Sequence, residues 1–450
     1  MNQTFEVTKE VIDELLQAIN SDDGQFISNF LDQLHTADVD TVFQKLNTNQ
    51  AKYCFNFMNH NAQADLISFL DQDIRVDFLK NFSSKSIASF IEQIDSDDAT
   101  DILNEQSPKT REEIISLISP EKSNAIRDLL RYDENSAGGL MAKELVKCHI
   151  DWNVGQCREE IRRLSEVVEN VFSVYVVDDK GVLLGWVPMK SLLLTNGSVP
   201  LKEIYVEEII SIRAYKNEEV VAEIMQKYDL ESIPVVDMLN NLLGRITIDD
   251  VVDVITEMAE RERQIMSGVS QNVESKDSIW AIAKSRLPWL TIGMFGGLLA
   301  AQVMGFFDEE LAQIPAMAFF IPLIMATGGN VGIQASSLVV QSIADRSFNE
   351  EDKWKDLMKS LLVSLVNGLV ISVLVFLFNV LINGDVRIAF VVANSLFFVV
   401  ILASLMGTIT PLVLNRFKVN PALASGPFIT TCNDLLGIAV YFLTARLLFN

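Results

Sequence analysis

Residues 287–307 read LPWLTIGMFGGLLAAQVMGFF and contain no charged side chain. Four further apolar stretches follow, at residues 311–343, 360–384, 388–414 and 419–445. A helix of about 20 residues crosses the ~30 Å hydrocarbon core of a bilayer, so each stretch is long enough for one span. The sequence therefore predicts a membrane domain of five α-helices over residues 287–450.

The second stretch is too long for one straight span. Its centre, residues 326–332, reads ATGGNVG. Small residues let neighbouring helices approach closely, so we expect either a bend or a close helix contact at this centre. Asn330 and Gln334 are one helical turn apart, and we expect both to line a pore.

Charge divides the chain into two unlike parts. Residues 281–450 carry ten acidic and ten basic side chains, so the whole formal charge of −24 falls on residues 1–280. An acidic surface argues against nucleic acid as a partner. Basic loop residues mark the cytoplasmic side of a membrane protein. They lie before the first span, between the second and third, and between the fourth and fifth.

This pattern predicts a multi-pass protein of the inner (plasma) membrane, with a cytoplasmic N-terminus and the C-terminus outside. The first ten residues have neither the basic nor the apolar region of a signal peptide. The four cysteines show no regular spacing, which is typical of free thiols in a reducing compartment.

Asp434 is the one acidic or basic residue well inside an apolar stretch. A carboxylate at that depth costs several kcal/mol unless it faces water, a partner group or an ion. Thr430 and Thr431 precede it by about one helical turn. Gly437 leaves room on the same face, and Pro427 frees a backbone carbonyl nearby. The alternative is a protonated acid that bonds a neighbouring helix.

The predicted ligands near Asp434 are all oxygen atoms, which suit hard cations such as Mg²⁺, Ca²⁺ or Mn²⁺. No histidine follows His149, and zinc or copper would favour nitrogen and sulfur ligands. One carboxylate per chain is a sparse site for a dication. A symmetric dimer that presents two carboxylates is therefore expected.

Residues 1–135 predict an acidic domain of short helices, because they lack strand alternation and contain helix starts at Ser107-Pro108 and Ser119-Pro120. The segments LISFLDQ (66–72) and IASFIEQ (87–93) recur at an offset of 21 and suggest a small stack of helical repeats. Asp97 and Asp101 lie one helical turn apart. They are either cation ligands or acids that stabilise the start of a helix.

Residues 136–260 contain a repeat with an offset of 59. The segments 171–193 and 230–252 share a strand, a turn, a second strand that ends near glycine, and a helix. This α/β pattern resembles a tandem pair of CBS domains, which commonly bind adenine nucleotides. Residues 261–286 then predict a connecting helix that leads to the first span.

The whole arrangement resembles the MgtE family of magnesium channels. The most specific motifs are YDENSAGGLM (132–141), PLIMATGGNVGIQ (322–334) and NPALASGPFITTCND (420–434). The resemblance implies a homodimer with one central pore in which Asp434 of each protomer holds the ion. It also implies that cytosolic Mg²⁺ closes the pore by bridging acidic faces of the helical domain, the CBS pair and the connecting helix. The matching acids are Asp97, Asp101, Glu219, Asp229, Asp250, Asp253 and Glu257.

The resemblance also implies a nucleotide site in the CBS pair, with ATP as the candidate ligand. Thr247 and Asp250 keep the hydroxyl and acid that typically hold the ribose. Pro188 and Ser191 replace that pair in the first unit. Asn217 and Asn420 stand where the family usually has an acid.

Two other functions fit part of the sequence. A carrier of broader divalent-cation range, Co²⁺ or Mn²⁺ included, would need more titratable groups in its spans if it were ion-coupled. A nucleotide-sensing membrane regulator without ion flux would leave Asp434 unexplained. An enzyme is not expected, because the sequence has no Ser/His/Asp, Cys/His or phosphate-loop arrangement.

Overall fold

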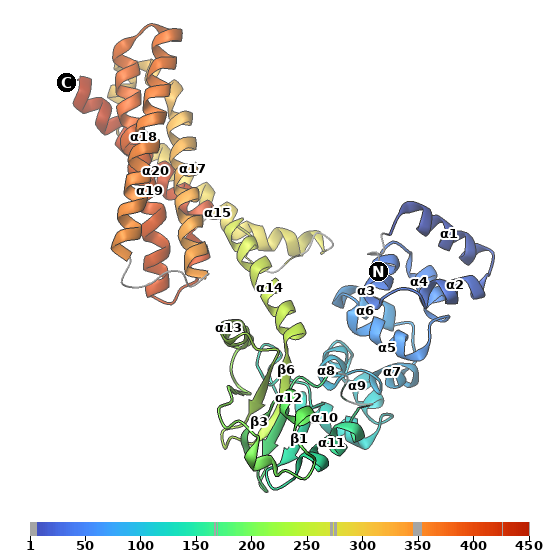
Figure 1. Cartoon of the computed structure of the whole chain (residues 1–450). Coiled ribbons are helices and arrows are strands. Elements are labelled where there is room, and N and C mark those ends of the chain that lie inside the picture. Colours follow the sequence, from blue (N-terminus) through green and yellow to red (C-terminus); the bar gives the residue numbers. More distant parts are fainter. Residues whose placement is uncertain are drawn as a thin grey trace. The chain divides into compact units, whose positions relative to one another are not determined.

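The structure is a computed structural model that describes residues 7–165, 168, 170–270, 273, 277–344, 353–424 and 426–449. It divides into two compact units, Met1–Ile255 and Thr256–Asn450. The first unit holds short helices and two small sheets. The second holds five helices that are long and apolar enough to span a membrane (Figure 1). The predicted fold class is confirmed.

The first unit begins with ten short helices, counted over the described residues up to Leu129. From α3 to α10 each helix begins 12 residues after the previous one. The helices are α1 (Lys9–Asn20), α2 (Gly24–Leu31), α3 (Thr36–Phe43), α4 (Thr48–Phe55), α5 (His60–Phe69), α6 (Gln72–Leu79), α7 (Ser84–Ile91), α8 (Ser96–Asn104), α9 (Pro108–Ile115) and α10 (Pro120–Leu129).

The helix starts follow from local sequence. Ser107 and Ser119 are N-caps whose side chains accept backbone hydrogen bonds, and a proline follows each of them. The predicted series of repeated helices is present, but alternate helices start 24 residues apart, whereas the two similar segments are offset by 21. Leu66 and Ile87, from the two similar segments, are both buried in the helical core. The two segments are therefore similar because each places apolar side chains in the same helical core.

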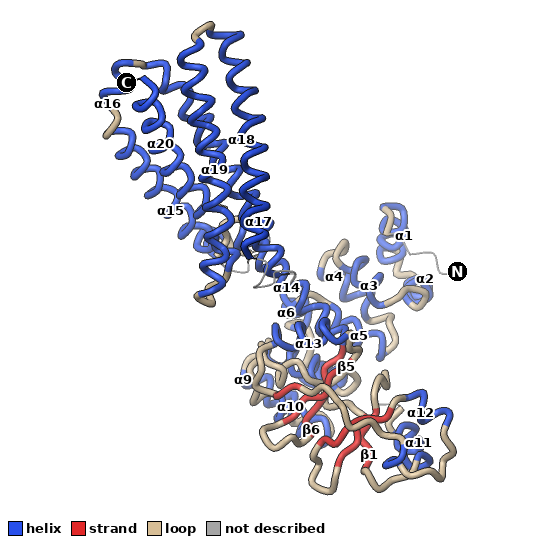
Figure 2. The backbone as a smooth tube through the Cα atoms, turned by 60° about the vertical axis from the view of Figure 1, so that its left-hand side comes forward, coloured by secondary structure: helices blue, strands red, loops and turns tan. Residues whose placement is uncertain are grey.

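Two three-stranded sheets follow, with the orders β1-β2-β3 and β4-β5-β6 (Figure 2). In each sheet the first pair is parallel and the second antiparallel. Val174 pairs with Val187, and Ile233 pairs with Ile246. Each residue of the second pair lies 59 positions after its counterpart in the first pair, as the sequence repeat predicts. The strands are β1 (Val146–His149), β2 (Val174–Val177), β3 (Leu183–Val187), β4 (Ile212–Arg213), β5 (Ser232–Val236) and β6 (Leu242–Thr247).

Four helices and a short 3-10 turn complete this region. They are α11 (Val154–Arg163), α12 (Met189–Leu194), η1 (Leu201–Glu203), α13 (Glu218–Tyr228) and α14 (Ile248–Met266). Strand β2 is buried along its whole length, as expected of a strand that is covered on both faces. Helix α14 begins directly after β6, so the acids at its start have a fixed place beside the second sheet.

The membrane unit is centred on α19, which packs against α17, α18 and α20 (Figure 1). Its elements are α15 (Ile279–Gly305), α16 (Asp308–Gln313), η2 (Pro315–Phe320), α17 (Ile321–Ala344), α18 (Lys353–Asn383), α19 (Val386–Arg416), η4 (Pro421–Ala424) and α20 (Pro427–Phe449). Helix α18 keeps most of its apolar side chains exposed, Leu381 and Ile382 among them. Such a surface suits contact with lipid.

The long second stretch breaks near its start. Helix α16 and the η2 turn precede α17, which then runs unbroken through residues 326–332. Of the two expectations for this centre, the structure has the close helix contact, within one continuous helix. Pro315 begins the η2 turn, because its ring fixes φ and removes a backbone donor.

The segment expected to form one connecting helix contains the end of one helix and the start of the next. Helix α14 ends at Met266, and α15 begins at Ile279. Gly268 has a φ of +80°, a left-handed conformation that commonly ends helices. The residues between them include positions outside the described ranges. Lys284 and Arg286 lie inside the first turns of α15.

Candidate functional site

Asp434 lies on α20 where this helix meets α17. A Cβ placed on Gly329 would be 3.8 Å from Asp434 Oδ1 and 3.1 Å from Thr430 Cγ2. Asp434 and Thr430 therefore share the face of α20 that points to Gly329. Both side chains are half-buried, so the carboxylate is neither sealed in the bundle nor fully exposed.

The other residues predicted around Asp434 take different positions. Thr431 packs against Gly296 of α15, and Gly437 is buried near Val399 of α19. Thr430 Oγ1 donates to Gly426 O at 3.0 Å, and Thr431 Oγ1 donates to Pro427 O at 2.8 Å. The carbonyls at the start of α20 thus already accept hydroxyl hydrogen bonds. The oxygen atoms of both threonines keep lone pairs for other partners.

Asn433 is a site residue that the sequence analysis missed. It is 2% exposed, and its Nδ2 donates to Gly328 O of α17 at 3.4 Å. A Cβ on Gly332 would lie 1.8 Å from the same nitrogen. Asn433 Oδ1 is buried and has no hydrogen-bond partner among the described residues. The sequence did contain one indication of this role, because Asn433 is an uncharged polar residue inside an apolar stretch.

Asn330 and Gln334 lie together on an exposed face of α17. The opposite side carries a buried ridge at every fourth residue, namely Ile324, Gly328, Gly332, Ser336 and Val340. The exposed face continues through Leu338, which is 69% exposed. One described copy of the chain therefore leaves a mixed polar and apolar face of a membrane helix uncovered.

The end of α14 packs against the start of α20. Gly426 has a φ of +59°, and a Cβ there would lie 2.2 Å from Met266 O. A Cβ on Gly268 would lie 2.8 Å from Pro427 Cγ. Glycine at position 426 thus lets two backbones meet at the entrance to the helix that carries Asp434.

A second group of acids lies in the first unit, where α8 faces the start of α14. Asp97 Oδ1 is buried and has no hydrogen-bond partner among the described residues. Burial and the nearby charge of Asp250 raise the pKa of Asp97 well above its usual value. Burial, together with the charges of Asp249 and Asp253, also raises the pKa of Asp98. The structure thus brings the acids of two distant segments together.

Among the acids of this group on α14, Asp250 has the largest rise in pKa. Burial, followed by the charge of Asp249, raises its pKa to about 7, although hydrogen bonds from Thr247 act in the opposite direction. Burial and the charge of Asp249 also raise the pKa of Asp253. Acids that resist ionisation beside each other favour the arrival of a compensating cation.

The remaining predicted sensor acids lie on α8, on α14 and at the two ends of α13. Burial and the charge of Asp98 raise the pKa of Asp101 to about 7. Asp101 is on α8 one turn after Asp97, and Glu257 is on α14 one turn after Asp253. Glu219 lies in the first turn of α13, and Asp229 is the C-cap of that helix with a φ of 52°. Among the described residues, no three His, Cys, Asp or Glu side chains converge as metal ligands. Mg²⁺ tolerates this, because it keeps several waters and needs only one or two carboxylates.

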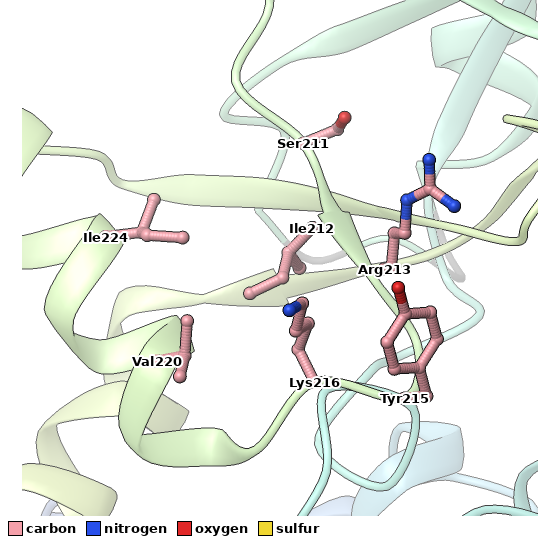
Figure 3. Close-up of a pocket in the computed structure, with 7 residues that line it drawn as sticks. All are labelled: Ser211, Ile212, Arg213, Tyr215, Lys216, Val220 and Ile224. Carbon is pink, nitrogen blue, oxygen red and sulfur yellow. The ribbon is translucent and has the colours of Figure 1, made fainter.

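Thr247 and Asp250, the expected ribose pair, bond each other. Thr247 Oγ1 donates to Asp250 Oδ2 at 2.8 Å, and Thr247 N donates to the same oxygen at 3.2 Å. A cavity of about 550 Å³ lies elsewhere in the second CBS unit (Figure 3). Arg213, Tyr215 and Lys216 line it, whereas Thr247 and Asp250 do not.

Three family models match the chain in order. The MgtE intracellular N domain covers residues 34–135, CBS domains cover residues 137–195 and 201–257, and MgtE, a divalent cation transporter, covers residues 321–444. The magnesium transporter MgtE of Bacillus subtilis (strain 168) is 26% identical over 412 residues, which are 92% of this chain and 91% of that protein. The magnesium transporter MgtE of Thermus thermophilus is 28% identical over 441 residues, 97% and 98% of the two chains.

Solved structures match the first unit. The cytosolic domain of the Mg²⁺ channel MgtE in complex with ATP is 26% identical, with a TM-score of 0.52, and the match covers 54% of this chain and 99% of that one. The soluble part of a magnesium transporter is 25% identical, with a TM-score of 0.51, over 56% and 99%. Relatives with these names are transporters rather than enzymes. The order of the matched parts, together with the five apolar helices, establishes that the chain is a multi-pass membrane protein of the MgtE family of divalent cation transporters.

Proposed function

We propose that the chain is a channel that imports Mg²⁺ across the plasma membrane and closes when cytosolic Mg²⁺ is abundant. In this proposal residues 1–135 and 136–260 form the sensor, residues 261–286 connect it to the membrane, and residues 287–450 form the pore. The N-terminus is cytoplasmic and the C-terminus is outside. The curated relatives support Mg²⁺ as the cargo, because they are named magnesium transporters.

The observation that carries the proposal is the position of Asp434. It is the one acidic or basic residue deep in the apolar stretches, and it points to Gly329 at a contact between two spans. Thr430 shares the face of Asp434 and supplies a further oxygen atom. Asn433 Oδ1, on the next residue, is a buried oxygen without a hydrogen-bond partner among the described residues. Oxygen ligands around one carboxylate favour a hydrated hard cation.

The proposed assembly is a homodimer with one central pore. The exposed face of α17, with Asn330 and Gln334, supports it because polar side chains on a membrane helix usually face a partner or water. A two-fold axis along this face would present Asp434 twice to the same ion. Two carboxylates can balance the charge of one dication.

The proposed closure uses the acids of α8 and α14. A dication held by Asp97 and Asp250 would offset the burial and the neighbouring negative charges that raise their pKa values. Helix α14 carries Asp250 near its start and reaches Met266, which lies against Gly426 at the start of α20. Ion binding at one end of α14 would thereby bias the entrance of the pore. Glu219, Asp229, Asp101, Asp253 and Glu257 complete the proposed sensor acids.

ATP is the proposed ligand of the CBS pair. A solved relative is described as a complex with ATP, and Thr247 and Asp250 keep the residue types that hold ribose in such domains. Their mutual hydrogen bond at 2.8 Å would have to open to admit a ribose. Binding of ATP to the purified protein, compared with the Thr247→Ala variant, tests this part.

The decisive experiment is Mg²⁺ flux through Asp434→Asn in liposomes. The substitution keeps the shape of the side chain and removes its charge. We expect flux to fall to the level of empty vesicles, because the ion loses its one charged ligand within the apolar stretches. Glu309→Gln, the same change on an exposed acid of α16, is the matched control and should conduct normally.

The same vesicles separate the competing functions. Normal Mg²⁺ flux through Asp434→Asn would overturn the pore site. Co²⁺ or Mn²⁺ flux equal to Mg²⁺ flux in the wild type would favour the broader carrier. Wild-type protein that conducts no divalent cation, yet binds ATP, would instead indicate a nucleotide-sensing regulator.

A further inference from the structure

We propose that Glu144 is the positioning residue of the cation sensor. It clamps Ser96 at the start of α8, so that Asp97 faces the acids of α14. The inference rests on the proposed function, because the clamp matters only if these acids bind a cation. Glu144 lies outside the three motifs that the sequence analysis singled out and is not among the predicted sensor acids.

The carboxylate of Glu144 is almost fully enclosed by polar partners. It is 8% exposed. Its Oε2 accepts hydrogen bonds from Ser96 N at 3.1 Å and from Ser96 Oγ at 2.6 Å, and its Oε1 pairs with Lys122 Nζ at 3.0 Å. Burial raises the pKa of Glu144, but Lys122 and Ser96 outweigh it, so the pKa is lowered overall and the group stays ionised.

These bonds cap α8 from a distant part of the chain. The local N-cap, Asp95, makes no side-chain cap hydrogen bond. Glu144, 48 residues away, accepts the backbone N–H of Ser96 in its place. A carboxylate at a helix start also interacts favourably with the helix dipole. Because Asp97 is the next residue, the bond to Ser96 fixes the direction in which Asp97 leaves the helix.

The same short segment also holds the other side of the sensor. Ala142 and Arg245 exchange backbone hydrogen bonds at 2.8 and 3.0 Å. Arg245 lies on β6, two residues before Thr247, and α14 follows with Asp250. Residues 142–144 therefore tie α8 to the strand that leads into α14. They set the separation of Asp97 and Asp250.

Lys143 strengthens this bridge between the helices and the second sheet. Its backbone N donates to Ser96 Oγ at 2.8 Å, and its Nζ contacts Asp128 Oδ2 of α10 at 2.7 Å and Leu243 O of β6 at 3.0 Å. Every donor and acceptor in the bridge belongs to the protein. These bonds join Ser96 of α8 to α10 and β6 through Lys143.

The test measures Mg²⁺-dependent stabilisation of the full-length protein with Glu144→Gln. A ligand that binds only the folded state raises Tm, and a weaker ligand needs a higher concentration to give the same increase. We expect the Mg²⁺ concentration at half-maximal Tm increase to rise about tenfold, since hydrogen bonds to charged groups are among the strongest. A merely structural role would lower Tm equally with and without Mg²⁺ and leave this midpoint unchanged.

The matched control is Glu112→Gln. Glu112 pairs with Arg127 at 2.9 Å on the exposed surface of the same helical region, so its loss should not move the midpoint. If Glu144→Gln does not fold, Ser96→Ala tests the same contact, because it removes the hydroxyl and keeps the backbone N–H bond. That variant should shift the midpoint in the same direction by a smaller factor.

The outcomes separate the clamp from the sensor. Wild-type protein that gains as much Tm from Na⁺ at matched ionic strength as from Mg²⁺ overturns the sensor, and the clamp with it. Wild-type protein that responds to Mg²⁺, with an unchanged midpoint in both Glu144→Gln and Ser96→Ala, overturns the clamp alone.

Discussion

At the scale of single residues, two neighbours on α20 do different work. Asp434 is half-buried and points to Gly329, whereas Asn433 is enclosed and bonds Gly328 O. The helix turns by about 100° per residue, so one side chain can hold the bundle together while the next faces a polar path. The packing of Asn433 thereby fixes the direction of Asp434.

We predict that Gly332→Ala destabilises the membrane unit by about 1–3 kcal/mol, the usual cost of overpacking. A Cβ at this position would lie 1.8 Å from Asn433 Nδ2, so α17 and α20 must separate or Asn433 must move. Thermal unfolding in detergent measures the effect, and Mg²⁺ flux should fall as well, because Asp434 shifts with its neighbour.

Gly297→Ala is the matched control for that change. Nothing lies within 4 Å of a Cβ at Gly297, and alanine has a higher helix propensity than glycine. The control should be neutral or slightly stabilising. Equal behaviour of the two variants would show that the contact between α17 and α20 is looser than described.

At the scale of elements, acidic side chains of α8 and α14 lie close enough to repel each other. Burial and neighbouring acids raise the pKa of Asp97 and bring the pKa of Asp250 to about 7. Groups whose pKa is raised where α8 packs against α14 stabilise that packing when they are protonated. The packing of α8 against α14 is therefore most stable well below pH 7, and it weakens as the pH rises through about 7.

We predict this pH dependence for full-length protein without divalent cations. Proteolysis of the first unit should accelerate as the pH rises from about 6 to about 8. Saturating Mg²⁺ should flatten the profile, because the ion replaces the protons. Asp97→Asn should also flatten it, whereas a profile unchanged by either treatment would place the titrating groups elsewhere.

Elements that follow from local or repeated signals were predicted from the sequence. The five spans follow from charge-free stretches, and the pairing of Ile233 with Ile246 follows from the 59-residue repeat. The break before α17 was not foreseen, because η2 is as apolar as a span. Glu144 and Ser96 were also missed. Their contact joins residues 48 positions apart, and no periodic pattern reports such a pair.

Asp434 was found because a lone acid in an apolar stretch is costly and therefore conspicuous. Asn433 carries no charge, so its burial could be seen only once α17 was placed beside it. The expectation that Thr431 shares the face of Asp434 followed from helical spacing alone. The structure places it against Gly296 of α15, because α20 has neighbours on more than one side.

At the scale of the whole molecule, the proposed switch links the sensor acids to the pore through α14. We predict that neutralising Asp250 and Asp253 together, as Asp250→Asn with Asp253→Asn, leaves conduction intact and weakens closure by internal Mg²⁺. Moving a channel from mostly open to mostly closed takes about 5.5 kcal/mol, so the loss of two sensor acids should raise the closing concentration several-fold. Patch-clamp titration of the cytosolic face measures it.

A double variant with the same charge change serves as the control. Glu112→Gln with Glu113→Gln removes two exposed acids from α9, and it should close at the wild-type Mg²⁺ concentration. If both double variants close at the same Mg²⁺ concentration as the wild type, Asp250 and Asp253 are ordinary surface charges and the switch lies elsewhere.

The 12-residue spacing of the N-terminal helices has a consequence for how this region can vary. Helix α3 packs on α5, α5 on α7, and α7 on α9, so most contacts join segments about 24 residues apart. Such modular chains melt by fraying from a free end, and their stability grows nearly in proportion to the number of modules. Asp97 lies on α8, which contacts α5, and Arg75 of α6 pairs with Glu105 at the end of α8. A 24-residue module upstream of α5 is therefore the one expected to act as a spacer that can be deleted or duplicated without altering the geometry at α8.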